Sequence, residues 1–377
     1  MSLVFFSILF LSCAIYCILI ISFTVGWYTK PSATKHFQND LPGLSVIIAV
    51  RNEAANIPDL IEHLKQQDYS NEKYEVIFSD DHSDDQTFQI LKNITTGISN
   101  FNCIDAPADS NFGKKAAIAK ALKIARYSII VFTDADCRMN SKWLLQIGNE
   151  FRDANLQMLL APIDIHVNDR KIFSAIQSLE FISLQGVTAG AANIHKPVMA
   201  NAANMACRKK AIEEVKRTMG GKKHLSGDDM FLLHAINRRY PKDIKYSKTI
   251  DAIVETSASQ NLKSFFRQRA RWSSKSVAYK DFFTLFTAVA AAGLNILIVT
   301  GIIAGLFISH LLYPTLIIWG MKTLIDFPLT YGAAVFFRKR HFLWMYIPLQ
   351  VIYPFYVSFT LFCATFSSVK WKQRTQQ

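Results

Sequence analysis

Charged side chains are scarce in this sequence, and three long stretches have none. Of 377 residues, 19% are Asp, Glu, Lys or Arg and 50% are hydrophobic. Residues 3–28, 282–321 and 342–368 contain none of the four charged types. So much apolar surface excludes a disordered or linker-like protein. Because a helix of about 20 apolar residues crosses a bilayer, we expect the first and last parts of the chain to lie in a membrane.

No two of the six cysteines are spaced as Cys-x-x-Cys. Cys103, Cys137 and Cys207 are scattered through the central part of the chain, and the other three fall in the apolar stretches. This arrangement argues against a disulfide framework and favours a reduced domain that faces the cytosol. The nine histidines show no ligand spacing either, so a zinc site is not expected.

The formal net charge of +13 does not indicate nucleic-acid binding. The sequence has no zinc-finger spacing and no aromatic RNA-binding signature. Its Lys and Arg residues are concentrated in residues 208–280 and beside the apolar stretches, at Lys30, Lys35 and residues 338–340. Retention of positive charge on the cytoplasmic side of a membrane explains this distribution. We predict an integral membrane protein, in a bacterial inner membrane, whose central domain faces the cytoplasm, with no nucleic-acid partner.

The N-terminal apolar stretch is interpreted as a membrane anchor and not as a cleaved signal peptide. It has no basic start and no small-residue cleavage site, and its first positive charges follow it. The predicted organisation is a transmembrane helix at 1–29, a cytosolic domain at 40–258, an interfacial amphipathic segment at 259–281, about three transmembrane helices in 282–368 and a basic tail at 369–377.

The C-terminal spans are expected at residues 282–309, 312–337 and 342–366. The second holds Lys322 and Asp326, which lie on one face of a helix because they are four residues apart. Contact with a lipid head group and mutual neutralisation are equal interpretations of this pair. Three spans after a cytosolic domain place the basic tail outside, against the positive-inside rule, so a re-entrant or interfacial segment is an alternative.

Between the apolar ends, short β-rich runs alternate with helical patterns. We predict strands at residues 44–50, 74–79 and 127–133, and helices at 54–67, 84–92 and 114–125. This alternation predicts an α/β fold with a mostly parallel sheet that has helices on both faces. In such sheets, ligands bind at the carboxyl ends of the strands.

Polar clusters follow each predicted strand: Arg51-Asn52-Glu53, then Asp80-Asp81, then Asp134-Ala135-Asp136. The last pair of carboxylates could share a hard divalent cation with phosphate oxygens, although a solvated loop is the simpler alternative. Ser83 or Asp84 is expected to cap the helix after the second strand.

Two further clusters lie downstream. Gly227-Asp228-Asp229 opens an apolar helical run, and a helix N-terminus stabilises carboxylates. These carboxylates either take part in a reaction or cap the helix. Gln268-Arg269-Ala270-Arg271-Trp272 lies in a basic, aromatic, amphipathic stretch that by itself is typical of an interfacial helix.

Taken in order, these clusters resemble the membrane-anchored family 2 glycosyltransferases with the Rossmann-like GT-A fold, the branch that includes cellulose and hyaluronan synthases and ceramide glucosyltransferase. The segments that carry the resemblance are LSVIIAVRNEAANI (44–57), VIFSDDHSDD (76–85), GKKAAIAKAL (113–122), FTDADC (132–137), GDD (227–229) and QRARW (268–272). The chain departs from the commoner pattern at Gly227-Asp228, where Thr-Glu is usual, and at Ala49, where Pro or Thr is frequent.

The resemblance implies a role for each matched residue. For the nucleotide-sugar donor these are Arg51, Glu53 and Asp81 at the nucleoside, Lys114 and Arg271 at the diphosphate, and Asp134 with Asp136 as ligands of Mg²⁺ or Mn²⁺. Asp229 matches the general base, and Gln268 and Trp272 match the acceptor site.

These roles imply an inverting transfer of a sugar from a nucleotide-sugar to a hydroxyl of a lipid or lipid-linked glycan. A processive polysaccharide synthase is one alternative, and a non-catalytic nucleotide-sugar-binding subunit of a glycan export complex is another. A UDP-sugar is favoured only by analogy. The sugar, the acceptor and the oligomeric state stay open.

Overall fold

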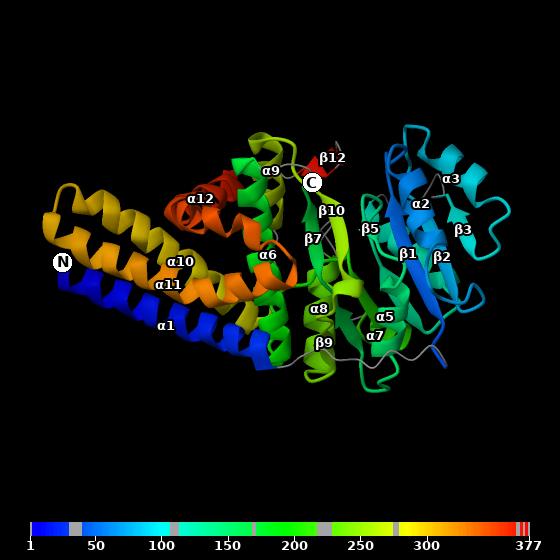
Figure 1. Cartoon of the computed structure of the whole chain (residues 1–377), viewed down its shortest axis with the longest axis horizontal. Coiled ribbons are helices and arrows are strands. Elements are labelled where there is room, and N and C mark those ends of the chain that lie inside the picture. The colour runs from blue at the N-terminus through cyan, green and yellow to red at the C-terminus, as the bar shows by residue number, and fades with distance from the viewer. Residues whose placement is uncertain are drawn as a thin grey trace. The chain divides into compact units, whose positions relative to one another are not determined.

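The computed structural model describes residues 2–29, 40–105, 113–167, 171–216, 228–273, 279–366, 370–371 and 374–375. The chain divides into two compact units, and Figure 1 labels many of their elements. The α/β unit comprises Pro31–His166 and Met199–Ser257, and the helical unit comprises Met1–Lys30, Val167–Val198 and Ala258–Gln377. The predicted domain boundaries stay a prediction, and the structure groups residues 167–198 with the helices.

The α/β unit contains ten strands and seven helices in its described residues. The strands are β1 (Leu44–Val50), β2 (Tyr74–Asp80), β3 (Phe101–Ile104), β4 (Ile129–Phe132), β5 (Arg138–Met139), β6 (Met158–Leu160), β7 (Ile163–His166), β8 (Met205–Arg208), β9 (Ile244–Tyr246) and β10 (Val254–Ser257). The helices are α2 (Ile57–Lys65), α3 (Thr87–Thr95), α4 (Lys114–Ile124), α5 (Trp143–Glu150), α7 (Lys209–Val215), α8 (Asp228–Arg239) and the short 3₁₀ helix η1 (Ile250–Ala252).

The main sheet has seven strands in the order β3-β2-β1-β4-β8-β6-β9. Its first four strands pair in parallel, as do β6 and β9. Only β8 is antiparallel to its neighbours, β4 and β6. The prediction of an α/β fold with a mostly parallel sheet is therefore confirmed, with one antiparallel strand that the sequence pattern did not indicate.

Hydrophobic strands form the centre of this sheet. In β1 every residue except Ala49 is buried, and all seven residues of β2 are buried. A strand that is covered on both faces needs a continuous apolar run, and LSVIIAV supplies one. Polar residues follow directly after β1, from Arg51, and β2 itself ends in Asp80, so the loops after both strands carry the polar groups of the candidate site.

A second sheet joins three short strands in the order β5-β10-β7. β10 pairs antiparallel with β5 and parallel with β7. Because Arg138, the first residue of β5, pairs with Glu255, this sheet brings β10 beside the loop that follows β4.

The helix predicted at residues 84–92 begins later than expected, as α3. The predicted cap is wrong, because both candidate side chains are used in the loop after β2. The Ser83 backbone N and Oγ donate to the Asp80 carboxylate at 2.9 and 2.5 Å, and Asp84 forms an ion pair with an arginine of the loop after β1. The Asp85 carboxylate accepts instead from the first residue of α3.

The helical unit contains α1 (Ser2–Thr29), α6 (Ile172–Asn193), α9 (Leu262–Ser273), α10 (Phe282–Gly305), η3 (Ser309–Leu311), α11 (Leu312–Phe336), η4 (Arg340–Met345) and α12 (Tyr346–Phe366), followed by the short strands β11 (Lys370–Trp371) and β12 (Arg374–Thr375). Three segments in the described residues are long and apolar enough to cross a membrane, Leu3–Thr29, Phe282–Gly305 and Arg340–Cys363. The chain is therefore membrane-associated, as expected. α11 is long enough to cross, but it includes Lys322 and Asp326.

α6 packs against α1 through two glycines at a close crossing. A Cβ atom on Gly190 would lie 2.1 Å from the Phe23 carbonyl oxygen, and one on Gly26 would lie 2.2 Å from that of Gly190. The Asn193 side chain donates to the Gly26 carbonyl at 3.0 Å. Small residues allow helix backbones to approach closely, which explains why α6 packs with the N-terminal helix.

Candidate functional site

The loops after β1 and β2 are joined by Arg51. Its Nη1 donates to the Asp81 carbonyl oxygen at 2.8 Å, and its Nη2 contacts Asp84 Oδ2 at 2.9 Å. The backbone N of Glu53 donates to Thr87 Oγ1 at 2.8 Å. Arg51 and Glu53, both predicted to contact the donor nucleotide, thus lie on a loop that is held against the carboxyl end of β2.

Asp81 anchors the start of α4. Only 1% of this residue is exposed, and its Oδ1 accepts from the Gly113 backbone N at 2.8 Å. Gly113 has a φ of 111°, a left-handed conformation that favours glycine. The predicted role of Asp81 in reading the base stays a prediction, but the structure shows that its carboxylate fixes the residue before Lys114.

Lys114, the first residue of α4, forms an ion pair with Asp134 in the loop after β4. Burial lowers the pKa of Lys114, but the charges of Asp134 and, more weakly, Asp229 raise it, and the net direction is upward. Lys114 is therefore held as a cation by its ion pair with Asp134, the predicted metal ligand, and it also feels the charge of Asp229, the predicted base.

The pKa of Asp136, in the same loop, is raised above its ordinary value. Burial raises its pKa, and the charges of Asp134 and Glu53 raise it further. The Thr256 hydroxyl, on β10, donates to Asp136 Oδ2 at 2.9 Å and lowers the pKa in part. Sequence reasoning missed Thr256, since a threonine in a short strand gives no sign of the carboxylate that it meets.

Asp229 lies in the first turn of α8. Its Oδ1 accepts from the backbone N of Met230 at 2.9 Å, and its Oδ2 accepts from that of Ala202 at 3.4 Å. Gly227 and the side chain of Asp228 lie outside the described part of the structure. The effect of Asp229 on the pKa of Lys114 shows that the predicted base lies within electrostatic range of the predicted diphosphate contact.

Asp134 and Asp136 fit a divalent cation that is shared with a phosphorylated ligand. In the described ranges no group of three or more His, Cys, Asp and Glu side chains could hold a metal ion by itself. Mg²⁺, however, commonly takes one or two carboxylates and completes its coordination with phosphate oxygens and water. Burial first, and then the negative charges of Asp134 and Glu53, raise the pKa of Asp136, and a bound cation would stabilise its ionised form.

The remaining predicted residues, Gln268, Arg271 and Trp272, lie on α9 of the helical unit. Gln268 Oε1 accepts from Arg269 Nη1 at 3.1 Å, and the Trp272 ring packs against Phe181 with centroids 6.3 Å apart. The structure thus gathers seven of the ten predicted residues in the α/β unit and holds three on one helix of the other unit.

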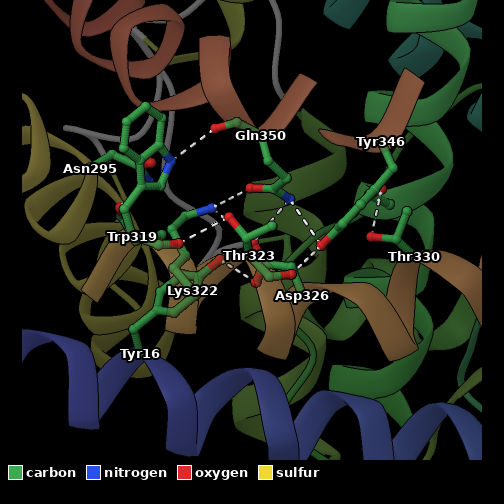
Figure 2. Close-up of polar contacts among 11 residues, drawn as sticks. Tyr16, Asn295, Trp319, Lys322, Thr323, Asp326, Thr330, Tyr346 and Gln350 are labelled. Carbon is green, nitrogen blue, oxygen red and sulfur yellow. Dashed lines mark hydrogen bonds and ion pairs between the residues drawn. The ribbon is translucent and has the colours of Figure 1, made fainter. Parts of the chain in front are cut away.

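A second polar cluster lies among α1, α11 and α12 (Figure 2). Lys322 is fully buried, and its Nζ contacts Asp326 Oδ2 at 2.8 Å and Gln350 Oε1 at 3.0 Å. The same ammonium lies 5.5 Å from the ring centroid of Tyr16 and 5.0 Å from that of Tyr353. The Tyr16 hydroxyl donates to Asp326 Oδ1 at 2.8 Å. This geometry favours mutual neutralisation over contact with a lipid head group.

Part of the chain is similar to known proteins. Residues 45–215 match the family described as Glycosyl transferase family 2. A beta-monoglucosyldiacylglycerol synthase of Trichormus variabilis is 33% identical over 113 residues, 30% of this chain and 24% of that protein. A poly-beta-1,6-N-acetyl-D-glucosamine synthase of Staphylococcus aureus is 28% identical over 149 residues, 39% of this chain and 35% of that protein. The chain thus spans between 24% and 35% of the length of these relatives.

Among solved structures, the mannosyltransferase PcManGT from Pyrobaculum calidifontis, in complex with GDP-Man and Mn²⁺, superposes with a TM-score of 0.60. It is 15% identical, and the match covers 96% of this chain and 99% of that one. This likeness shows the fold, which is GT-A. Over residues 45–215 the chain is similar to glycosyl transferase family 2.

Proposed function

We propose that this protein is a membrane-bound inverting glycosyltransferase. It moves a sugar from a nucleotide-sugar, in particular a UDP-sugar, to a hydroxyl of a lipid-linked or glycan acceptor. The observation that carries the proposal is the ion pair between Lys114, at the start of α4, and Asp134, in the loop after β4, with Asp229 near enough for its charge to help raise the pKa of that lysine. A lysine cation paired with one carboxylate at the strand ends suits a diphosphate, and a second carboxylate, Asp229, suits a hydroxyl that must be deprotonated.

Asp229 acts as the general base in this proposal. It takes the proton of the acceptor hydroxyl while the hydroxyl oxygen attacks the anomeric carbon of the sugar. The bond between that carbon and the diphosphate oxygen breaks, and the nucleoside diphosphate leaves with the electron pair. One displacement inverts the anomeric centre, so no covalent enzyme intermediate is needed. A positioned general base typically contributes about 10²- to 10⁴-fold in rate.

The donor is bound by Arg51, Glu53 and Asp81 on the nucleoside side and by Lys114 and Arg271 on the diphosphate side. Asp134 and Asp136 would hold Mg²⁺ or Mn²⁺. When bound, this cation supplies charge stabilisation to the departing diphosphate. Lys114 contributes a second positive charge from α4, which is fixed in place by the contact between Asp81 and Gly113.

A lipid acceptor is supported by two features of the chain. One relative is named for glucosylating a diacylglycerol, and three segments of this chain can cross a membrane. We assign acceptor binding to Gln268 and Trp272 on the amphipathic helix α9. The basic residues Lys30 and Lys35, which follow α1, support an orientation with the α/β unit in the cytoplasm, as in a bacterial inner membrane.

The test is release of nucleoside diphosphate by the full-length protein in detergent. UDP- and GDP-sugars are offered in turn with Mg²⁺ or Mn²⁺ and with dioleoylglycerol or its monoglucosyl derivative, both of which carry free hydroxyls, in mixed micelles. We expect acceptor-dependent release that falls about 10²- to 10⁴-fold in Asp229→Asn. Asp68→Asn, the same change at an exposed aspartate of the α/β unit, is the matched control and should leave the rate unchanged.

The product distinguishes the alternative functions. A single transfer gives one glycosylated lipid, whereas a processive synthase, as the polysaccharide synthase relative is named, gives a ladder of products from one donor. A protein that binds UDP or GDP but releases neither from any donor would contradict the proposal and support a non-catalytic binding subunit.

A further inference from the structure

Arg269 is the most deeply buried charged residue of α9, with 4% of its surface exposed. It stands within the QRARW segment but is not one of the residues that matched a family role. Burial lowers its pKa, but Glu180 on α6 raises it, and the net direction is upward, so the guanidinium stays charged. The two side chains form an ion pair in which each is 4% exposed.

This ion pair is tied to a third helix. The Tyr356 hydroxyl, on α12, donates to Glu180 Oε1 at 3.3 Å. The Tyr356 ring also packs against Phe265 of α9, with centroids 5.7 Å apart. Arg269 is therefore held by groups from α6 and α12, which fixes the position of α9 within the helical unit.

The same guanidinium contacts both residues of the proposed acceptor site. Its Nη1 donates to Gln268 Oε1 at 3.1 Å, and its Cζ lies 4.3 Å from the centroid of the Trp272 ring. The Arg269 Cζ also lies 4.8 Å from the ring centroid of Phe265, which is four residues earlier in the same helix. A planar guanidinium can pair with a carboxylate, bond to an amide oxygen and stack on an indole at once, which a lysine ammonium cannot do with the same geometry.

We infer that Arg269 is a positioning residue for the acceptor, anchored by Glu180 and Tyr356 and holding the side chains of Gln268 and Trp272 in place. This inference rests on the proposed function, which assigns the acceptor to those two side chains. It does not place Arg269 in contact with the substrate. It predicts that loss of the guanidinium weakens use of the acceptor and leaves nucleotide binding as it was.

The test measures KM for the acceptor, kcat, and the Kd for UDP or GDP on the full-length protein. The acceptor is dioleoylglycerol or its monoglucosyl derivative, whichever the wild-type protein glycosylates. In Arg269→Lys we expect KM for the acceptor to rise by about tenfold to a hundredfold. A substrate that is misplaced by about 1 Å can lose up to about a hundredfold in reaction efficiency. The nucleotide Kd should not change. Arg267→Lys, an exposed arginine of the same helix, is the matched control.

A second variant separates positioning from folding. In the double variant Arg269→Met and Glu180→Leu, an apolar pair replaces the buried ion pair, an exchange that folded proteins often tolerate. The inference requires a raised KM for the acceptor in each of the two variants that folds. A wild-type KM in either folded variant, or loss of folding in both, would assign the ion pair a structural role and overturn the inference. Absence of turnover by the wild-type protein would instead contradict the proposed function.

Discussion

Thr256 joins two parts of the chain that lie 120 residues apart. Its hydroxyl donates to Asp136 and so fixes the orientation of one of the two proposed metal ligands. Groups that orient a ligand carboxylate commonly contribute to metal affinity although they never touch the metal. The small sheet β5-β10-β7 therefore supplies, through Thr256 on β10, a hydrogen bond that orients a proposed metal ligand of the candidate site.

Removal of this hydroxyl in Thr256→Val should lower the affinity for the divalent cation by about 10- to 100-fold, because Asp136 loses the donor that orients it. The measurement is the Mn²⁺ concentration that gives half-maximal nucleoside diphosphate release. Thr256→Ser retains the hydroxyl and should behave as wild type. Equal Mn²⁺ requirements for the valine and serine variants would exclude this role.

Packing between elements depends on small residues as much as on apolar ones. The crossing of α1 and α6 brings Gly190 and Gly26 so close that neither has room for a Cβ atom. By contrast, a Cβ on Gly293 of α10 would meet nothing within 4 Å. The two environments allow the same substitution to be compared at a crowded and at an open site.

We expect Gly190→Ala to lower the free energy of unfolding by about 1–3 kcal/mol, since the added methyl forces the two backbones apart. Gly293→Ala should be neutral or stabilising by about 0.5–1 kcal/mol, because alanine favours the helix. Thermal unfolding of both variants in the same detergent is the measurement. Equal unfolding temperatures would show that the crossing is not as close as described.

At the level of the whole molecule, the cluster around Lys322 connects the first membrane helix to the last ones. Tyr16 belongs to α1, Lys322 and Asp326 belong to α11, and Gln350 belongs to α12 (Figure 2). Because both charges are compensated within the cluster, removal of one partner leaves the other buried without its counter-charge.

Lys322→Met should therefore destabilise the protein by about 3–5 kcal/mol, and the double variant Lys322→Met with Asp326→Leu should recover most of the loss. Lys65→Met removes the cation of an exposed ion pair with Glu62 and should cost only about 0–1 kcal/mol. Unfolding temperatures in detergent provide the test. A lipid head-group site would show a different result, namely an unchanged unfolding temperature with a loss of affinity for undecaprenyl phosphate.

Local patterns predicted the elements around the site well. β1 begins and ends at the predicted residues, and α4 begins at the predicted Lys114. Continuous apolar runs identify buried parallel strands, and polar residues directly after such runs identify the ligand-binding edge of the sheet. The predicted start of α3 was wrong because Ser83 and Asp84 bind other partners in the folded loop.

The sequence by itself determined the α/β class, the apolar spans and the order of the polar clusters. Each of these depends on residues that are near one another in the chain, through hydrophobic periodicity and through the polar ends of strands. The tertiary structure alone decided that Thr256 meets Asp136, that α6 packs with α1, and that Arg269 pairs with Glu180. These contacts join residues far apart in the chain, and a linear pattern does not specify which of many polar or small residues will meet.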